Sequence, residues 1–300
     1  MKRTRRLAFV AAFSLLAAGC GGSDAGNQAE EEESAEPTVA EDVTFDEGTT
    51  MFDLNAAGAL SVGTKFDQPG FGLLNPTTDT PEGFDVEIAY LIAAALGIPE
   101  DGVTFTESVS ANREPFIQNA TVDIVVATYT INDTRKGLVS FAGPYYVAGQ
   151  DIMVAAGNPE GIEGPEDLAG KTVCSVEGST PAQNIRDNFP EITLITTDVY
   201  SKCADQLKNG EVVAVTTDNV ILTAFVSTDP ESFELVGNPF TEEPYGIGLG
   251  LEDDDFRDFI NDVLEDAYES GAWTAAYDST IGAITDTEAP EPPDVDRYTR

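Results

Sequence analysis

The chain has 300 residues, 41% of them hydrophobic, which is enough to bury a core and excludes a globally disordered chain. Asp and Glu number 54 against 15 Lys and Arg, a formal net charge of −39. This balance argues against a nucleic-acid partner, because phosphates are neutralised by clustered cations. The sequence contains no histidine, so His-ligated zinc and imidazole-dependent catalytic triads are excluded.

The first nineteen residues have the pattern of an export signal. Four basic residues within the first six positions precede an apolar run at 7–18 that is too short to span a bilayer comfortably. The run ends in LAAGC at 16–20, which resembles the bacterial lipobox, where the cysteine becomes the lipidated N-terminus. We therefore expect residues 1–19 to be removed and Cys20 to carry lipid. Ordinary secretion, with Cys20 as a free thiol, is the alternative.

Two terminal segments have the composition of disordered chain. Residues 20–44 are rich in Gly, Ser, Asn and Gln and include four consecutive glutamates, which predicts a solvated acidic tether. Residues 285–300 contain three prolines and predict a disordered tail. The folded part should therefore span about residues 45–284.

The first half of this part alternates strand-like and helix-like segments. The spacing of apolar residues predicts a helix at 83–97, ended by Gly97, and a shorter helix at 112–119. The expected strands lie at 59–64, 103–107 and 122–127. The last of these is continuously apolar, as in a strand buried on both faces of a parallel sheet.

A second set of alternating elements begins near Asp151. Strands are expected at 171–176, 192–196, 212–216 and 233–236, with helices at 181–188, 200–209 and 219–226. Two helices, 254–270 and 272–281, should close the domain. Repeated strand–helix units imply parallel sheets, and their division into two groups predicts two α/β lobes rather than one barrel.

Polar residues follow the strands of both groups, where open α/β sheets bind ligands. They are Thr64-Lys65, Thr128-Tyr129-Thr130, Gly178-Ser179-Thr180 and Thr217-Asp218. A ligand held between the lobes would contact all four segments.

Cysteine count predicts one disulfide. Three cysteines remain after export, and if Cys20 carries lipid, Cys174 and Cys203 can pair, as expected outside the cytosol. A catalytic thiol is the competing interpretation, but no histidine is present to activate it.

Several motifs in order resemble the family 3 bacterial extracellular solute-binding proteins, the amino-acid receptors of ABC importers. They are GFDVEIA at 83–89, VVATYTI at 125–131 followed by Arg135, FAGPYY at 141–146, EGST at 177–180 and TD at 217–218. The segments VGTKFDQPG at 62–70 and CSVEGSTPAQ at 174–183 are similar to its glutamate-binding branch.

The resemblance implies two lobes joined by two crossing strands, near 146–155 and 239–250, that close on a ligand. The first lobe would comprise residues 45–148 plus 243–284, and the second 149–242. The implied protein is a monomeric receptor, held at the membrane by its lipid alone, that delivers an amino acid to a permease. It lies on the outer face of the cell membrane or in the periplasm, needs no cofactor or metal, and is not an enzyme.

The resemblance also assigns the groups that hold an amino acid's main chain. Arg135 would bind the α-carboxylate, assisted by Thr130 and Thr180, because a guanidinium fork matches a carboxylate. Asp218 would bind the α-ammonium with help from Thr128, although Asp218 could simply cap the helix that follows it. Ser179 belongs to the same ligand-binding set.

Specificity for the ligand's side chain is assigned to two cations. Lys65 and Arg113 occupy cleft positions of acidic-amino-acid receptors, which predicts glutamate or aspartate as ligand. The alternatives are a solvated loop lysine and an ion pair of Arg113 with Glu107 or Glu114.

Three aromatic residues, Phe66, Phe71 and Tyr129, could cover the ligand's methylenes or be plain core. A glutamine or asparagine receptor, a dehydratase-like enzyme on the same scaffold, and a sensory lipoprotein remain as alternatives for the whole chain.

Overall fold

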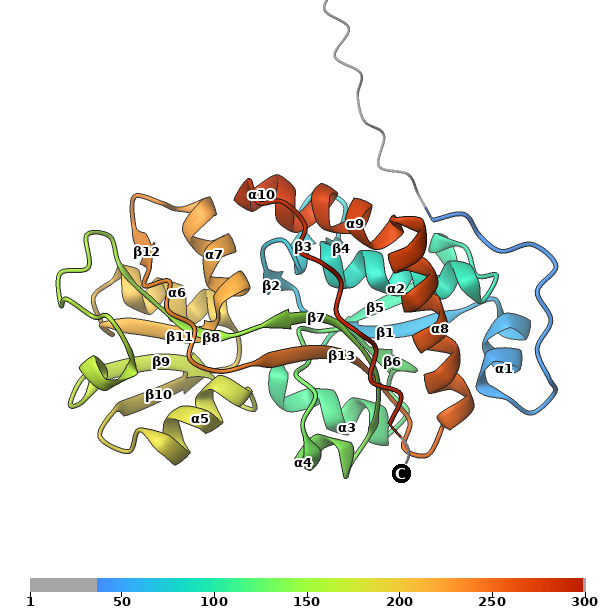
Figure 1. The fold of residues 1–300 in the computed structure, drawn as a ribbon, viewed down its shortest axis with the longest axis horizontal. Coiled ribbons are helices and arrows are strands. Elements are labelled where there is room, and N and C mark those ends of the chain that lie inside the picture. The colour runs from blue at the N-terminus through green and yellow to red at the C-terminus, as the bar shows by residue number, and fades with distance from the viewer. Residues whose placement is uncertain (1–36, 299–300) are drawn as a thin grey trace, which may run out of the picture. The chain divides into compact units, whose positions relative to one another are not determined.

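The computed structural model describes residues 37–298, and the first lobe is built on a five-stranded sheet in the order β5-β1-β6-β13-β7 (Figure 1). Its strands are β1 (Leu60–Thr64), β5 (Val103–Glu107), β6 (Ile124–Val125), β7 (Ser140–Ala148) and β13 (Glu243–Leu249). Strand β1 pairs in parallel with β5 and β6, whereas β13 is antiparallel to β6 and β7.

The second lobe also has a five-stranded sheet, in the order β10-β9-β11-β8-β12. Its strands are β8 (Gln150–Ala155), β9 (Thr172–Val176), β10 (Thr193–Thr197), β11 (Ala214–Asp218) and β12 (Phe233–Leu235). Strands β10, β9 and β11 run parallel, and β8 is antiparallel to β11 and β12.

Two adjacent chain segments connect the lobes. Strand β7 continues into β8 across the single residue Gly149, and β13 returns beside β7 with Tyr146 opposite Tyr245. A Cβ at Gly149 would lie 2.7 Å from the carbonyl oxygen of Thr241, so the close approach of the two segments requires glycine here. These features confirm the predicted fold class, two α/β lobes joined by crossing strands.

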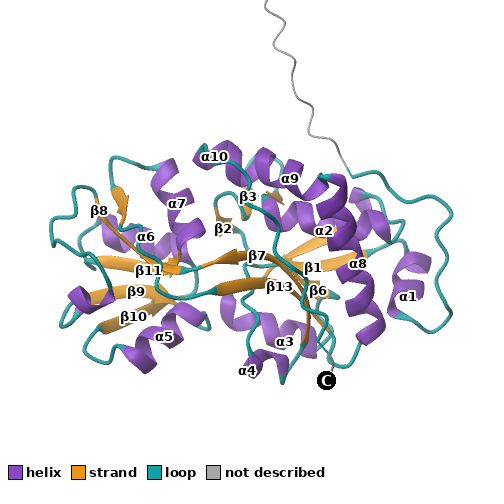
Figure 2. Ribbon diagram, viewed as in Figure 1, coloured by secondary structure: helices purple, strands orange, loops and turns teal. Residues whose placement is uncertain are grey.

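Helices cover both sheets, and a small sheet of β2 (Asp67–Gln68), β3 (Gly72–Asn75) and β4 (Thr80–Glu82) lies beside α2 in the first lobe (Figure 2). The first lobe contains α1 (Thr50–Ala57), α2 (Phe84–Ala95), α3 (Arg113–Gln118), α4 (Asp133–Lys136), α8 (Asp254–Ser270), α9 (Ala272–Tyr277) and α10 (Ala283–Thr285). The second lobe contains α5 (Thr180–Asn188), α6 (Tyr200–Lys208) and α7 (Asn219–Thr228). Single turns occur at Glu100–Gly102, Ser110–Asn112, Pro165–Leu168 and Asp278–Gly282.

Each lobe has its own core. In the first lobe the rings of Phe84, Trp273 and Tyr145 are buried together, and the Trp273 indole donates to the carbonyl of Tyr145 at 2.8 Å. In the second lobe the predicted disulfide between Cys174 and Cys203 joins β9 to α6. Among residues 37–298, we find no helix with the length and apolar character that a bilayer crossing requires.

The described parts of the two terminal segments, residues 37–44 and 286–298, lie against the first lobe, whereas their composition predicts disorder. Residues 37–44, the described end of the expected tether, contact the first lobe, where the amide of Ala40 donates to the carbonyl of Ala94 at 2.9 Å. Residues 286–298 form an extended strap without helix or strand. Composition is a poor guide here because a proline-rich segment can be held by a few side-chain anchors.

The strap is anchored at its end. The Tyr298 ring lies 4.1 Å from the Lys136 ammonium and 4.8 Å from the Arg257 guanidinium, and its hydroxyl oxygen accepts the Phe141 amide at 2.9 Å. Asp296 pairs with Lys136 at 3.1 Å, beside Arg135 on α4. The strap therefore ties α4 to α8.

We expect Tyr298→Ala to lower the free energy of unfolding by about 2 kcal/mol, because two cation–π contacts and a hydrogen bond are lost. Urea denaturation measures this. Tyr298→Phe keeps the ring and should lose only about half as much. Parent-like stability of the alanine variant would mean that the strap is not attached.

Candidate functional site

A narrow cavity of about 10 Å³, room for about one water molecule, lies between the lobes. Ten residues line it, six of them predicted from the sequence: Arg113, Thr128, Thr130, Ser179, Thr180 and Asp218. The other four are Ser110, Pro181, Tyr200 and Ile221. The cavity thus draws on both lobes, at the ends of strands and the starts of helices.

Local structure aims the second lobe's polar groups at the cavity. Strand β9 ends at Val176, and after a turn Ser179 caps α5 by accepting the amide of Ala182 at 3.1 Å. Strand β11 ends at Asp218, immediately before α7. The positive N-terminal ends of two helices therefore face the cavity.

Arg113 forms part of the first lobe's wall. Its guanidinium is buried and donates to the carbonyls of Ser110, Ala127 and Thr128 at 3.0–3.2 Å. It also donates to the carbonyl of Gly178, in the opposite lobe, at 3.3 Å. The alternative ion pair with Glu114 is not formed, because Glu114 pairs with Arg135.

Arg135 is also buried, but it faces a neighbouring groove rather than the cavity. It donates to the carbonyl of Thr130 at 2.7 Å, to Gly178 at 3.0 Å and to the Glu114 carboxylate at 3.1 Å. Burial, and then the neighbouring Arg113 charge, lower its pKa to about 10. Both guanidiniums therefore donate to one carbonyl oxygen of the opposite lobe.

Thr128 has a strained backbone, with φ of 43°, which is uncommon for a β-branched residue and concentrates at functional sites. Its amide donates to Asp85 at 2.8 Å and its hydroxyl to Gln68 at 3.1 Å. Asp85 also accepts the Tyr145 hydroxyl at 2.6 Å, and burial raises its pKa to about 7. The motif at 83–89 thus positions the cavity wall through Asp85.

Lys65 is not a solvated loop residue. It is buried, and its ammonium group donates to the Ser110 hydroxyl at 2.8 Å, directly behind the cavity wall. Burial, followed by the charge of Arg113, lowers its pKa to about 7. A negative charge in the cavity would favour the protonated form.

Asp218 is a buried carboxyl group of the second lobe that lines the cavity. Its Oδ2 accepts the Tyr245 hydroxyl at 2.6 Å, while its Oδ1 has no hydrogen-bond partner among the described residues. Burial raises its pKa to about 7, with a further contribution from Glu243. Its side chain makes no capping bond to α7, so the capping alternative is wrong.

The predicted aromatic residues do not line the cavity. Tyr129 lies beneath both cations, 4.4 Å from Arg113 and 5.0 Å from Arg135, and thereby supports them. Phe71 belongs to the first lobe's aromatic core and Phe66 is half-buried. Sequence reasoning missed Tyr200, whose only signal is its place at the start of a helix after a strand.

The lobes are closed on each other. The Thr180 hydroxyl lies 2.7 Å from Glu243 and 3.1 Å from the Thr130 hydroxyl. Gly178 has φ of 80°, and a Cβ there would lie 2.8 Å from the backbone of Ala111 in the first lobe. Glycine at 178 therefore permits the observed closure.

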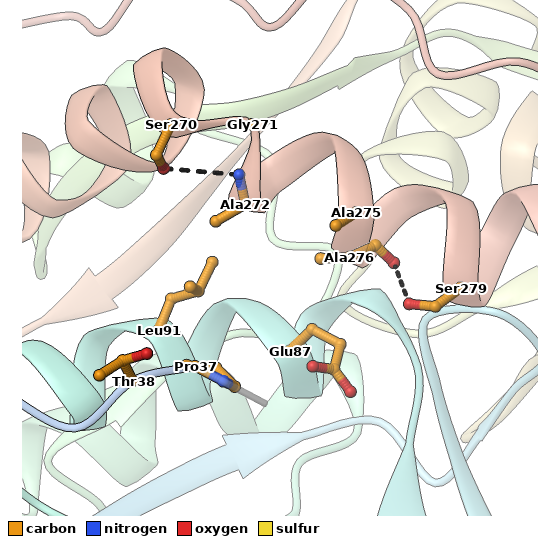
Figure 3. A pocket seen from close by; sticks show the side chains of 10 residues that line it. All are labelled: Pro37, Thr38, Glu87, Leu91, Ser270, Gly271, Ala272, Ala275, Ala276 and Ser279. Carbon is orange, nitrogen blue, oxygen red and sulfur yellow. Dashed lines mark hydrogen bonds between the residues drawn. The ribbon is translucent and has the colours of Figure 1, made fainter. Parts of the chain in front are cut away.

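A second hollow lies away from these residues, between α2 and α9 (Figure 3). Its ten lining residues include Glu87 but no lysine or arginine, so it does not provide a partner for a carboxylate. Within the described residues, no group of three or more acidic or cysteine side chains is placed to hold a metal ion.

Comparison with known proteins places the chain in a family. Residues 60–283 match the model of the bacterial extracellular solute-binding proteins, family 3, so the chain belongs to this family of amino-acid receptors. The glutamate-binding protein GluB of Corynebacterium glutamicum is 40% identical over 235 residues, covering 75% of this chain and 79% of that protein. The glutamine-binding protein GlnH of Bacillus subtilis is 34% identical, covering 94% and 98%.

The fold of this chain is similar to the folds of solved structures. An L-cysteine solute receptor of Neisseria gonorrhoeae matches with a TM-score of 0.74 and 27% identity, covering 79% of this chain and 95% of that one. An ancestral arginine-binding protein bound to glutamine matches with a TM-score of 0.69 and 34% identity, covering 74% and 97%. The extracytoplasmic class expected from the sequence is therefore supported.

We expect Gly178→Ala to fold but to weaken amino-acid binding by about tenfold or more, because its Cβ would meet the opposite lobe's backbone. Calorimetry measures the affinity, and small-angle scattering measures the compaction on ligand addition. Gly170→Ala is the matched control, with φ of 74° in the second lobe and no atom within 4 Å of the added Cβ. Equal affinity of the two variants would contradict this account of closure.

Proposed function

We propose that the chain captures an acidic amino acid, glutamate or aspartate, between its lobes, among the residues that line the narrow cavity, which must widen to admit it. The observation that carries the proposal is the buried, unpartnered Oδ1 of Asp218 in a cavity whose opposite wall is cationic. A buried carboxylate oxygen is costly without a hydrogen-bond partner, and an α-ammonium supplies one. Thr128, in the other lobe, would help Asp218 to bind the α-ammonium.

The α-carboxylate belongs beside Arg135, Thr130 and Thr180. Arg135 donates to Gly178, and Thr180 lies at the start of α5, whose amides favour an anion. A carboxylate entering from the cavity would compete with the Gly178 carbonyl for the guanidinium. A charge-assisted bond is stronger than a bond to a neutral carbonyl, so the ligand would win this competition.

The side-chain carboxylate is assigned to Arg113 and Lys65. Both are buried cations beside the cavity, and Ser110 links Lys65 to its wall. Together with Arg135 they supply three positive charges for the ligand's two carboxylates. The 40% identical relative in Corynebacterium glutamicum is named for glutamate binding, which supports the same ligand.

Glutamine is the second candidate. Two relatives at 34% and 36% identity, from Bacillus subtilis and Geobacillus stearothermophilus, are named as glutamine-binding proteins. A neutral amide in the same place would leave buried cations without an anionic partner. We therefore favour the acidic ligand.

Binding makes and breaks no covalent bond. A ligand that joins Asp218 in one lobe to Arg135 in the other favours the closed state, which a membrane permease of an ABC importer would then recognise. We propose lobes of residues 45–148 plus 243–284 and 149–242. The proposed lipid anchor, Cys20, lies outside the described residues and would hold a monomer at the outer face of the cell membrane or in the periplasm.

Calorimetry with the twenty amino acids, on the chain beginning at residue 21, tests the proposal. We expect glutamate or aspartate to bind at about micromolar affinity. Asp218→Asn and Arg135→Ala should each weaken this binding by about a hundredfold, because each leaves a buried ligand charge unpaired. Unchanged affinity of either variant would refute the corresponding assignment.

Proton exchange separates the two candidate ligands. The lowered pKa of Lys65, about 7, should rise when a side-chain carboxylate binds beside it, so at pH 7.5 glutamate should take up about half a proton more than glutamine. Proton release from Asp218 is common to both ligands and cancels in the difference. Calorimetry in buffers of different ionisation enthalpy measures this difference in proton uptake between the two ligands.

The control for this measurement is Lys65→Met, in which the difference between the two ligands should disappear. The same variant should also lose preference for glutamate. A difference in proton uptake that persists without Lys65 would remove that residue from the side-chain site.

A further inference from the structure

Helix α6 of the second lobe begins without a cap of its own. Its N-cap residue is Val199, whose side chain makes no capping bond in the described structure. The first amides of a helix have no intrahelical acceptor, and an apolar N-cap is among the least favourable. The amides of Tyr200 and Ser201 therefore need an acceptor from elsewhere.

The first lobe supplies that acceptor. Asp67, on β2, accepts the Tyr200 amide at 2.7 Å and the Ser201 amide at 3.3 Å, both on the same oxygen, Oδ2. The residues are 133 and 134 positions apart in the chain. A carboxylate at this position also interacts favourably with the positive end of the helix.

Both ends of this contact are fixed within their own lobes. Helix α6 is tied to β9 by the disulfide at Cys203, and β2 is hydrogen-bonded to β3. Opening the lobes must therefore separate Asp67 from α6, because neither end can follow the other. The contact exists in the observed closed state, and opening of the lobes would break it.

The contact also lies against the cavity without being part of it. Tyr200 lines the cavity, and Gln68, next to Asp67, accepts a hydrogen bond from the Thr128 hydroxyl at 3.1 Å. Asp67 is absent from the cavity lining. Its hydrogen bonds thus act on the closed arrangement rather than on the ligand.

We propose that Asp67 is a closure latch, a positioning residue that caps α6 of the opposite lobe and slows ligand release without touching the ligand. A contact made only in the closed state raises the population of that state and must break before the ligand leaves. This inference rests on the proposed capture by closure.

Stopped-flow kinetics of glutamate binding tests the latch. Asp67→Ala should speed dissociation by about tenfold, the range expected for loss of a helix cap, while association changes by less than about twofold. Asp67→Asn retains a capping oxygen and should restore dissociation to within about threefold of the parent.

The matched control is Asp253→Ala. Asp253 caps α8 through the Phe256 amide at 3.3 Å, within the first lobe, so its loss should lower stability without changing dissociation. Equal dissociation rates for Asp67→Ala and the parent, or equal acceleration in Asp253→Ala, would overturn the latch.

A second measurement separates failure of the latch from failure of the proposed ligand. Hydrogen exchange at the Tyr200 and Ser201 amides should be faster in Asp67→Ala than in the parent or in Asp253→Ala when the lobes are held closed by whichever amino acid calorimetry shows to bind. If glutamate does not bind but this acceleration is seen, the ligand assignment fails and the contact stands. Unchanged exchange refutes the latch whichever amino acid binds.

Discussion

Two buried guanidiniums, of Arg113 and Arg135, donate to the carbonyl oxygen of Gly178 in the opposite lobe. Both rest on the ring of Tyr129, and both are too deeply buried to be solvated by bulk water. Buried charges of this kind need hydrogen-bond acceptors. The carbonyl of Gly178 moves with the other lobe, so it becomes an acceptor for them only when the lobes close. The geometry of the cavity, the need for glycine at 178 and the proposed role of the ligand all depend on this convergence.

The fold class could be predicted from local patterns, whereas the cavity residues were predicted from polar strand ends together with the resemblance to the family, which alone pointed to Arg113. Parallel strands place the residues after their ends at one edge of each sheet, which groups Thr180 with Asp218, and the prediction that the ligand lies between the lobes then added Thr130. The helix expected at 83–97 runs from Phe84 to Ala95, and the expected 254–270 helix is α8. The apolar strand expected at 122–127 is shorter, at Ile124–Val125.

The features that sequence could not supply are contacts between distant segments. Asp67 is 133 residues from the amide it caps, and Tyr298 is 157 residues from Phe141. Although Asp67 lies in the 62–70 segment, neither contact could be predicted from a periodic pattern or a motif, because each depends on how two separately folded parts meet. For the same reason the sequence did not predict the hydrogen bond from Tyr245, on a crossing strand, to Asp218.

The aromatic core of the first lobe has a practical consequence for spectroscopy. The chain has one tryptophan, Trp273, fully buried and hydrogen-bonded to Tyr145, whose hydroxyl in turn meets Asp85. The Trp273 indole is thus shielded from quenchers. Through Tyr145 and then Asp85 it is connected to the strained backbone at Thr128. The fluorescence of Trp273 therefore reports whether the first lobe is folded. Fluorescence measurements on the second lobe need an added dye.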